Sequence, residues 1–264
     1  MTELEHLQAV LLSIIKEIDA LCRKNGIAYY LLGGSCIGAV RHRGFIPWDD
    51  DLDIIMTRPN YERFVQVCRT QLDASKYYLQ EGLKDWPLNF SKIRLKGTAL
   101  HEPEDDYAPA DRRGIYVDVF YLEHVPDNPV LARIQYLLAK YYLCYQLRCR
   151  RYRQASFRKR LLLALAAPME WTFLRKRIVG FIERFNSRPA ERFGFFYGRT
   201  CYKTAVTARK IYGTPKYVPF EDTWLPVPEH FHEYLTQMFG DYMQLPPESQ
   251  RKGLHLISVD FGAY

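Results

Sequence analysis

Four aspartates fall within five positions of the chain, at Asp49, Asp50, Asp51 and Asp53. Apolar residues stand between and just after them, so these acids border a buried strand and not a polar loop. Carboxylates repel one another and are costly to desolvate, so they gather beside a core where a cation binds. The segment therefore predicts a metal site, and a solvated acidic turn is the alternative.

We predict a strand over 51–55, in which Asp51 and Asp53 share one face because side chains alternate along a strand. Their Cα atoms are then roughly 6–7 Å apart, so both carboxylates can reach one divalent cation. Mg²⁺ prefers carboxylate oxygens together with water and substrate phosphates, so Mg²⁺ (or Mn²⁺) is the expected cofactor. Of the two preceding acids, we expect one to support the site and the other to face water.

A glycine turn, Gly33-Gly34-Ser35, precedes the acids. We predict a strand over 27–32 that runs into this turn and a helix over 35–43 that follows it. The unpaired N–H groups and the dipole at a helix start favour an anion, so the turn is a candidate phosphate site. Many glycine pairs only make turns, and that is the alternative.

Two later strands carry further candidates. The predicted strand 90–95 presents Lys92 and Arg94 on one face, which suits substrate phosphates, although an edge strand with protective charges explains them too. The β-type run 114–120 contains one acid, Asp118, which is costly to bury without a partner. A metal shared with the acidic strand would supply that partner.

Apolar periodicity predicts helices around these strands. They are expected over 3–25, 60–72, 131–147 and 157–174 and in a segment that begins after Pro228. Two carboxylates on one strand and a third on another, after a glycine-rich turn, resemble the nucleotidyltransferase fold. We therefore predict an α/β (α+β) class with a mixed sheet, surrounding helices and a helical insertion.

The expected organisation has three parts: a catalytic core over 1–130, a basic helical insertion over 131–190, and a segment over 191–264 that packs back on the core and completes the catalytic domain. The polar, acidic loop 101–113 is typical of a lid. Composition is ordinary for a globular protein, with 48% hydrophobic and 25% charged residues. The six cysteines form no CxxC pair, and the N-terminus lacks a signal-peptide pattern, so a cytoplasmic location is expected.

The positive charge is local. Residues 134–181 hold 11 Lys or Arg and one acid, Glu170, a segment charge of +10 in a chain of net charge +7. The apolar runs here are shorter than the roughly 20 residues of a membrane span. Basic flanks around apolar helices suit peripheral contact with an anionic membrane surface, and a helical subdomain with a solvated basic face is the alternative.

The segment GGSCIGAVRHRGFIPWDDDLDI resembles the signature of the LicD family of phosphocholine transferases, which is similar to fukutin-type phosphosugar transferases. The similarity continues in SKIRLKGT (91–98), in GIYVDVF (114–120) and in LPVPEHFHEYLTQMFGDYMQLPP (225–247). These four segments span most of the chain in the family's order. One departure is Tyr121, where the family often has proline.

The resemblance implies a metal-dependent phosphotransferase with a nucleotidyltransferase core and Mg²⁺ or Mn²⁺. It implies CDP-choline as donor and a sugar hydroxyl of a surface glycan as acceptor, such as a teichoic acid or a lipooligosaccharide precursor, in either case free or lipid-linked. In other branches the donor is a CDP-polyol, which transfers ribitol or glycerol phosphate. The family's aspartates fall on Asp49, Asp51 and Asp53, with Asp118 as the acid of the third strand.

These expectations give each candidate a role. Asp51 and Asp53 hold the metal, and Asp118 completes its shell or accepts the proton of the attacking hydroxyl. The remaining candidates bind substrate: Gly33, Gly34, Ser35, Arg41 and Asp49 at the donor diphosphate, and Lys92 and Arg94 at the transferred phosphate or acceptor.

Two other functions remain open at the level of sequence. A nucleotidyltransferase acting on RNA or a small molecule would use the basic segment to grip phosphates. The basic residues lie between long apolar runs, however, so no nucleic acid is expected. A degenerate transferase that serves as a membrane-surface module is the non-enzymatic alternative.

Overall fold

The computed structural model describes residues 1–101, 113–150, 156–198, 200–251, 253 and 258–264. Residues 102–112 of the loop expected to form a lid lie outside this described part. The described chain forms two compact units. Unit 1 contains Met1–Glu81, Phe90–Tyr121 and Lys210–Tyr264, and unit 2 contains Gly82–Asn89 and Leu122–Arg209. The domain limits expected at 130/131 and 190/191 stay a prediction.

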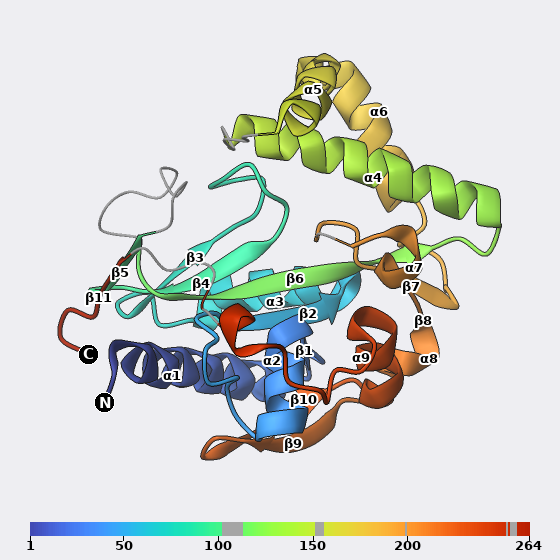
Figure 1. The fold of residues 1–264 in the computed structure, drawn as a ribbon. Coiled ribbons are helices and arrows are strands. Elements are labelled where there is room, and N and C mark those ends of the chain that lie inside the picture. Colours follow the sequence, from blue (N-terminus) through green and yellow to red (C-terminus); the bar gives the residue numbers. More distant parts are fainter. Residues whose placement is uncertain (102–112, 151–155, 199, 252, 254–257) are drawn as a thin grey trace. The chain divides into compact units, whose positions relative to one another are not determined.

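The central sheet of unit 1 is drawn in Figure 1. Its strands, in spatial order, are β1 (Tyr30–Leu31), β2 (Asp53–Thr57), β6 (Tyr116–Val125), β4 (Ser91–Leu95) and β3 (Tyr77–Gln80). The unit boundary crosses β6 after Tyr121. β1 pairs antiparallel with β2, and β4 pairs antiparallel with both β6 and β3. Helices and strands together make the mixed α/β fold that the sequence predicts.

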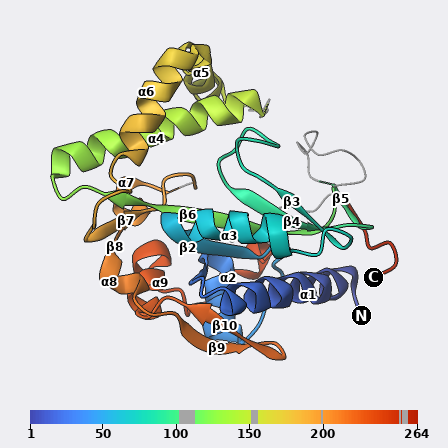
Figure 2. The same ribbon diagram turned by 180° about the vertical axis from the view of Figure 1, so that it is seen from behind.

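Helix α1 (Glu3–Lys24) is the longest helix of unit 1. The hydroxyl of Thr2 accepts from the Glu5 N–H at 3.2 Å, and the Glu5 carboxylate accepts from the Thr2 N–H at 2.7 Å. This capping box satisfies two N–H groups that the first turn leaves unpaired. One face of α1 is buried, and the helix contacts α3 (Arg58–Gln71), which packs on β2 (Figure 2).

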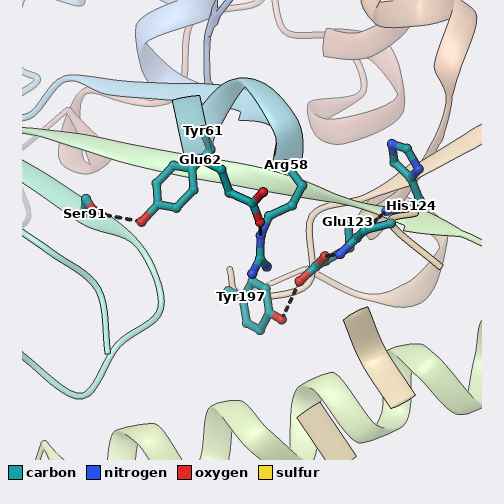
Figure 3. A network of polar contacts seen from close by, with 8 residues as sticks. Arg58, Tyr61, Glu62, Ser91, Glu123, His124 and Tyr197 are labelled. Carbon is teal, nitrogen blue, oxygen red and sulfur yellow. Dashed lines mark hydrogen bonds and ion pairs between the residues drawn. The ribbon is translucent and has the colours of Figure 1, made fainter. Parts of the chain in front are cut away.

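Polar contacts also tie α3 to the sheet. The Tyr61 hydroxyl lies 2.7 Å from the Ser91 hydroxyl of β4, and Arg58 pairs with Glu62 one turn along at 2.8 Å (Figure 3). The Arg58 guanidinium lies 4.5 Å from the ring centroid of Tyr121. The first turn of α3 is therefore held against β4 and β6 by these side chains.

The C-terminal part of unit 1 returns to the core through short elements. They are α8 (Arg209–Tyr212), β9 (Lys216–Phe220), β10 (Thr223–Val227), α9 (Phe231–Phe239), η4 (Glu248–Gln250) and β11 (Ser258–Asp260), which pairs with β5 (Ala99–His101). β9 and β10 form an antiparallel hairpin, and α9 contacts α2 (Gly33–Ile37). Gly240, at φ +70°, ends α9.

Helices α4, α5 and α6 and the end of β6 form the larger elements of unit 2. Its elements are α4 (Pro129–Cys149), α5 (Phe157–Leu165), η3 (Ala167–Glu170), α6 (Thr172–Glu183), β7 (Arg192–Gly194), α7 (Tyr202–Ala205) and β8 (Val206–Ala208). β6 pairs with β7, which pairs with β8. The core between α4 and α6 includes Tyr142, Ile182 and Phe196. The buried Glu123 carboxylate accepts from the Tyr197 hydroxyl at 3.0 Å (Figure 3).

Several predicted boundaries are wrong. The predicted strand 27–32 is reduced to β1 because the chain turns into α2 at Gly33, and 51–55 becomes β2, which begins at Asp53. Only residues 116–120 of the run 114–120 are in a strand. They begin β6, which extends to Val125 because its last three residues pair with β7 far along the chain. The helix expected over 157–174 is broken by Pro168, which cannot continue the hydrogen-bond ladder.

None of the helices in the described part of the chain has the length and apolar character needed to cross a bilayer.

Candidate active site

The glycine turn and the acidic strand are joined directly. The Ser35 hydroxyl accepts from the Asp53 N–H at 2.9 Å, and the Leu32 N–H donates to the Asp53 carbonyl at 2.9 Å. Gly33 adopts φ +54°, a conformation in which a side chain is strained, and its N–H donates to the Tyr234 hydroxyl at 3.3 Å. These contacts hold the turn against the start of β2.

The helix after the turn differs from the expected one. It begins at Gly33, two residues early, and after five residues it continues as a π-helical turn, η1 (Gly38–His42). A Cβ at Gly38 would lie 2.5 Å from the Gly44 carbonyl oxygen, so only glycine allows the chain to fold back this closely. The proposed phosphate-binding role of Gly33, Gly34 and Ser35 stays a prediction.

The predicted carboxylates gather at this junction. The loss of surrounding water raises the pKa of Asp53 well above its ordinary value, and the charges of Asp51, Asp118 and Asp49 raise it further. Lys92 acts in the opposite direction. The acids named from the sequence therefore lie close enough to influence one another, although Asp118 is 65 residues away from Asp53 in the chain.

Asp49 belongs to the same group. Burial, followed by the charges of Asp51 and Asp50, raises the pKa of Asp49 to about 8. Its Oδ2 lies 2.8 Å from the position that a Cβ on Gly34 would occupy, so it faces the glycine turn. One of Asp49 and Asp50 was expected to face water. Asp50 is buried as well, and it lies against Gly253. That expectation is wrong, because Gly253 packs against this acid.

Lys92 and Asp118 form a buried ion pair across β4 and β6. They are direct partners in the strand register, and Nζ lies 3.1 Å from Oδ1 of Asp118. The Asp118 N–H donates to the Leu52 carbonyl at 3.1 Å, which places β6 beside the acidic segment. Nζ of Lys92 also lies 3.2 Å from the ring centroid of Tyr116. The cation is thus held by a carboxylate and an aromatic face.

Arg94 is fully buried, and its guanidinium contacts are internal. Nε donates to the Gln80 side chain at 2.8 Å, and Nη1 donates to the Gly114 carbonyl at 3.0 Å. Its guanidinium also lies 4.6 Å from the ring centroid of Tyr116. The contacts fit a residue that supports Tyr116 and the sheet, and the predicted contact of Arg94 with substrate remains untested.

Arg41 extends toward the C-terminal segment of unit 1. Its Nη1 donates to the carbonyls of Tyr242 at 2.6 Å and Gln244 at 3.3 Å. Burial, followed by the nearby charge of Arg251, lowers the pKa of Arg41. Two cations in one neighbourhood suit an anion, but the guanidinium of Arg41 donates to backbone carbonyls and to His42 and not to the acids.

The donor chemistry at the junction suits a hard divalent cation. Carboxylate oxygens are the ligands that Mg²⁺ and Mn²⁺ accept, and a bound cation would offset the repulsion that raises the pKa of Asp53. Within the described residues, no three His, Cys, Asp or Glu side chains are already arranged to hold a metal ion. The metal set Asp51, Asp53 and Asp118 stays a prediction.

Sequence reasoning missed two aromatic residues at the site. Tyr116 precedes Asp118 by two positions on β6, so the strand period could have placed it on the same face. Tyr234, from α9, binds the turn at Gly33, and no local pattern connects positions 201 residues apart.

We expect that Gly34→Ala will reduce transfer activity by roughly 100-fold, because a methyl group would displace the Asp49 carboxylate, and a 1 Å misplacement can have such an effect. Stability should change little, since alanine is favourable in a helix. The matched control is Gly180→Ala in α6, where a Cβ meets no atom within 4 Å. Steady-state kinetics and thermal unfolding of both variants test this, and full activity of Gly34→Ala would contradict the assigned contact.

Comparisons with known proteins agree with the geometry. Residues 26–128 match the family described as LicD/FKTN/FKRP, nucleotidyltransferase domain. The chain is 30% identical over 259 residues to the lipopolysaccharide cholinephosphotransferase LicD of Haemophilus influenzae, which covers 94% of each protein. An uncharacterized protein of Rickettsia typhi is 42% identical over 57 residues, 22% of this chain and 18% of the relative.

An uncharacterized protein of Rickettsia prowazekii is 50% identical over 44 residues, 17% of this chain and 16% of the relative. The similarity to the Haemophilus protein extends over both units, whereas the family model covers the part that contains the glycine turn, the acids and β6. The chain therefore belongs to the LicD family of nucleotidyltransferase-domain proteins and is a transferase.

Proposed function

We propose that the protein transfers phosphocholine from CDP-choline to a sugar hydroxyl of a cell-surface glycan, such as a lipopolysaccharide or teichoic acid precursor. The observation that carries this proposal is the similarity over 94% of both chains to a protein named as a lipopolysaccharide cholinephosphotransferase. The cluster of Asp49, Asp51, Asp53 and Asp118 supports it, because a metal held by such carboxylates would neutralise the charge that develops when a diphosphate is cleaved.

In this proposal Asp51, Asp53 and Asp118 hold Mg²⁺ or Mn²⁺, which supplies positive charge to the donor diphosphate. The attacking sugar oxygen forms a bond to the phosphorus that carries choline, and the bond between that phosphorus and the oxygen of CMP breaks. CMP leaves with the bonding electrons, and the hydroxyl proton passes to a base. Asp118 either completes the metal shell or is that base.

The other residues position these groups. Lys92 orients the Asp118 carboxylate through the 3.1 Å ion pair, and Tyr116 limits the movement of the Lys92 side chain. Asp49 lies against Gly34, so the acidic cluster and the glycine turn form one surface for the donor diphosphate. We assign Gly33, Gly34, Ser35 and Arg41 to that diphosphate.

We propose a cytoplasmic location for this reaction. The six cysteines are all free thiols, and three of them are buried, Cys22, Cys36 and Cys68. Burial raises the pKa of each of these three thiols, which keeps them protonated and unreactive. Unpaired thiols suit a reducing compartment.

A donor panel tests the proposed reaction. The purified chain is incubated with Mg²⁺ or Mn²⁺ and with CDP-choline, CDP-ribitol or CDP-glycerol, and CMP release is measured with and without candidate glycans. We expect CMP release from CDP-choline that increases with glycan and stops when EDTA removes the metal.

Each other outcome has a defined meaning. CMP release from CDP-ribitol or CDP-glycerol alone would mean that the protein transfers a polyol phosphate and not phosphocholine. Incorporation of a nucleotide from an NTP into RNA would refute the transferase reaction proposed here. Activity that persists in EDTA would contradict the metal assignment.

A further inference from the structure

Unit 2 exposes an unusual number of large apolar side chains on adjoining elements. Helix α5 has no buried residue, although most of its second half is leucine. Six side chains on α5 and at the start of α6 are between 49% and 76% exposed: Phe157, Leu161, Leu162, Leu165, Trp171 and Phe173. We call these six residues the α5–α6 surface. Exposed patches of this kind on a folded protein mark interaction sites.

The residues of α5 in this surface lie on one side of the helix. Phe157, Leu161 and Leu165 follow one another at four-residue steps, which places them in one stripe. The stripe is not buried against the rest of unit 2, because each member is exposed. An amphipathic helix whose apolar stripe is uncovered needs an apolar partner outside the chain.

The elements beneath this surface are firmly packed. Met169 of η3 and Ile178 and Ile182 of α6 belong to the buried core of unit 2, to which α4 contributes Ala132, Ala139 and Tyr142. The Tyr141 hydroxyl of α4 donates to the Leu165 carbonyl at 3.1 Å. Arg175 donates to the Met169 carbonyl at 3.0 Å. The apolar side chains of the α5–α6 surface are thus exposed even though the elements that carry them are packed into unit 2.

Positive charge surrounds the same residues. Arg158, Lys159 and Arg160 are exposed on α5, and Lys176 and Arg177 are exposed on α6. The guanidinium of Arg177 lies 5.1 Å from the ring centroid of Phe173. Glu170, the one acid between 134 and 181, pairs with Arg148 at 3.2 Å. The one acid of this segment thus pairs with a cation of α4 and not with the exposed cations of α5 and α6.

The combination of exposed leucine, exposed tryptophan and cations selects one partner. A second copy of the chain would bring a +10 segment against the same segment, and a nucleic acid would leave the leucines in water. An anionic bilayer surface accepts apolar side chains at the acyl boundary and cations at the headgroups, and tryptophan favours that interface.

We propose that the α5–α6 surface docks onto an anionic lipid bilayer without crossing it. The apolar residues enter the boundary between headgroups and acyl chains, and the basic residues contact the lipid phosphates. This docking does not depend on the reaction proposed above, since unit 2 carries it and vesicle binding needs neither donor nor acceptor.

Sedimentation of the full chain with lipid vesicles tests the proposal. The probes are vesicles of phosphatidylcholine alone and of phosphatidylcholine with phosphatidylglycerol. We expect the parent chain to bind only the anionic vesicles. Leu165→Ser/Trp171→Ser should bind at least tenfold more weakly. The matched control, Trp224→Ser/Leu245→Ser, removes the same residue types from exposed positions of unit 1 and should bind as the parent does.

A second pair of variants tests the charges. Arg158→Glu/Lys159→Glu/Arg160→Glu should also bind at least tenfold more weakly. Its control reverses three exposed basic residues elsewhere, Lys24, Arg209 and Lys210, and has the same net charge. Thermal unfolding of all four variants checks that they are folded. If this control lost as much vesicle binding, net charge and not the position of the cations would explain the loss.

Three results would overturn the docking surface. Parent-like binding by Leu165→Ser/Trp171→Ser would mean that charge alone attracts the protein. A dimer in light scattering that this variant abolishes, together with no vesicle binding by the parent, would assign the surface to self-association. No binding of the parent to anionic vesicles would refute the proposal outright.

Discussion

Replacing Asp53 by asparagine should reduce CMP release from the donor at least 100-fold, equivalent to ~2.7 kcal/mol of transition-state stabilisation, while the fold becomes no less stable. The carboxylate lies among Asp49, Asp51 and Asp118, and burial and these charges raise its pKa. An amide removes one of the repelling charges and places N–H donors beside the remaining carboxylates. It also removes a hard anionic ligand of the proposed metal.

The difference in stability between Asp53→Asn and the parent protein should depend on pH. The pKa of Asp53 is raised above its ordinary value of 3.8, so the folded protein retains a proton that the unfolded chain releases. The parent therefore loses stability as the pH rises above that value. In thermal unfolding without metal, the stability of Asp53→Asn relative to the parent should increase as the pH rises from 4 to 8. Below pH 4 the variant and the parent should be equally stable.

Asp127→Asn is the matched control, because Asp127 is an exposed acid in unit 2. It should keep parent activity and parent stability. If Asp53→Asn retained more than about a tenth of the activity, a loss of only about 1.4 kcal/mol, the assignment of Asp53 to the metal would be wrong. A marked fall in its unfolding temperature would instead indicate a structural role.

Lys92→Met should destabilise the protein by about 3 kcal/mol, because breaking a buried ion pair leaves a buried charge without compensation. Lys92 is 3% exposed and Asp118 is 13% exposed, so solvent screens the pair little. The substitution also removes the cation from the face of Tyr116. Denaturant unfolding measures this loss, and donor turnover should fall with it because Asp118 is no longer oriented.

Two further variants separate the effects. Lys92→Met/Asp118→Asn removes both charges and should recover most of the lost stability without recovering activity. Lys16→Met breaks the Lys16–Asp222 ion pair, whose side chains are 40% and 68% exposed, and should change stability little because solvent screens the two charges. A Lys92→Met chain as stable as Lys16→Met would show that the buried pair contributes nothing to the fold.

Elements with local signals could be predicted from the sequence. The capping box of Thr2 and Glu5, the apolar stripe of α1 and the stop at Gly240 depend on residues within one or two helical turns. The strands β7, β8, β9, β10 and β11 were not predicted, because their partners lie elsewhere in the chain and short strands have weak patterns of their own.

The acids, the glycine turn and the family could be recognised from the sequence, because they are short-range patterns of residue type and spacing. Which charged side chains pair with one another depends on the tertiary structure. It pairs Lys92 with Asp118, encloses Arg94 between Gln80 and Gly114, and directs Arg41 toward Tyr242. Strand register and burial depend on the packing of the whole sheet. Residues that are neighbours in the sequence therefore do not specify whether a cation faces a carboxylate, a carbonyl or the solvent.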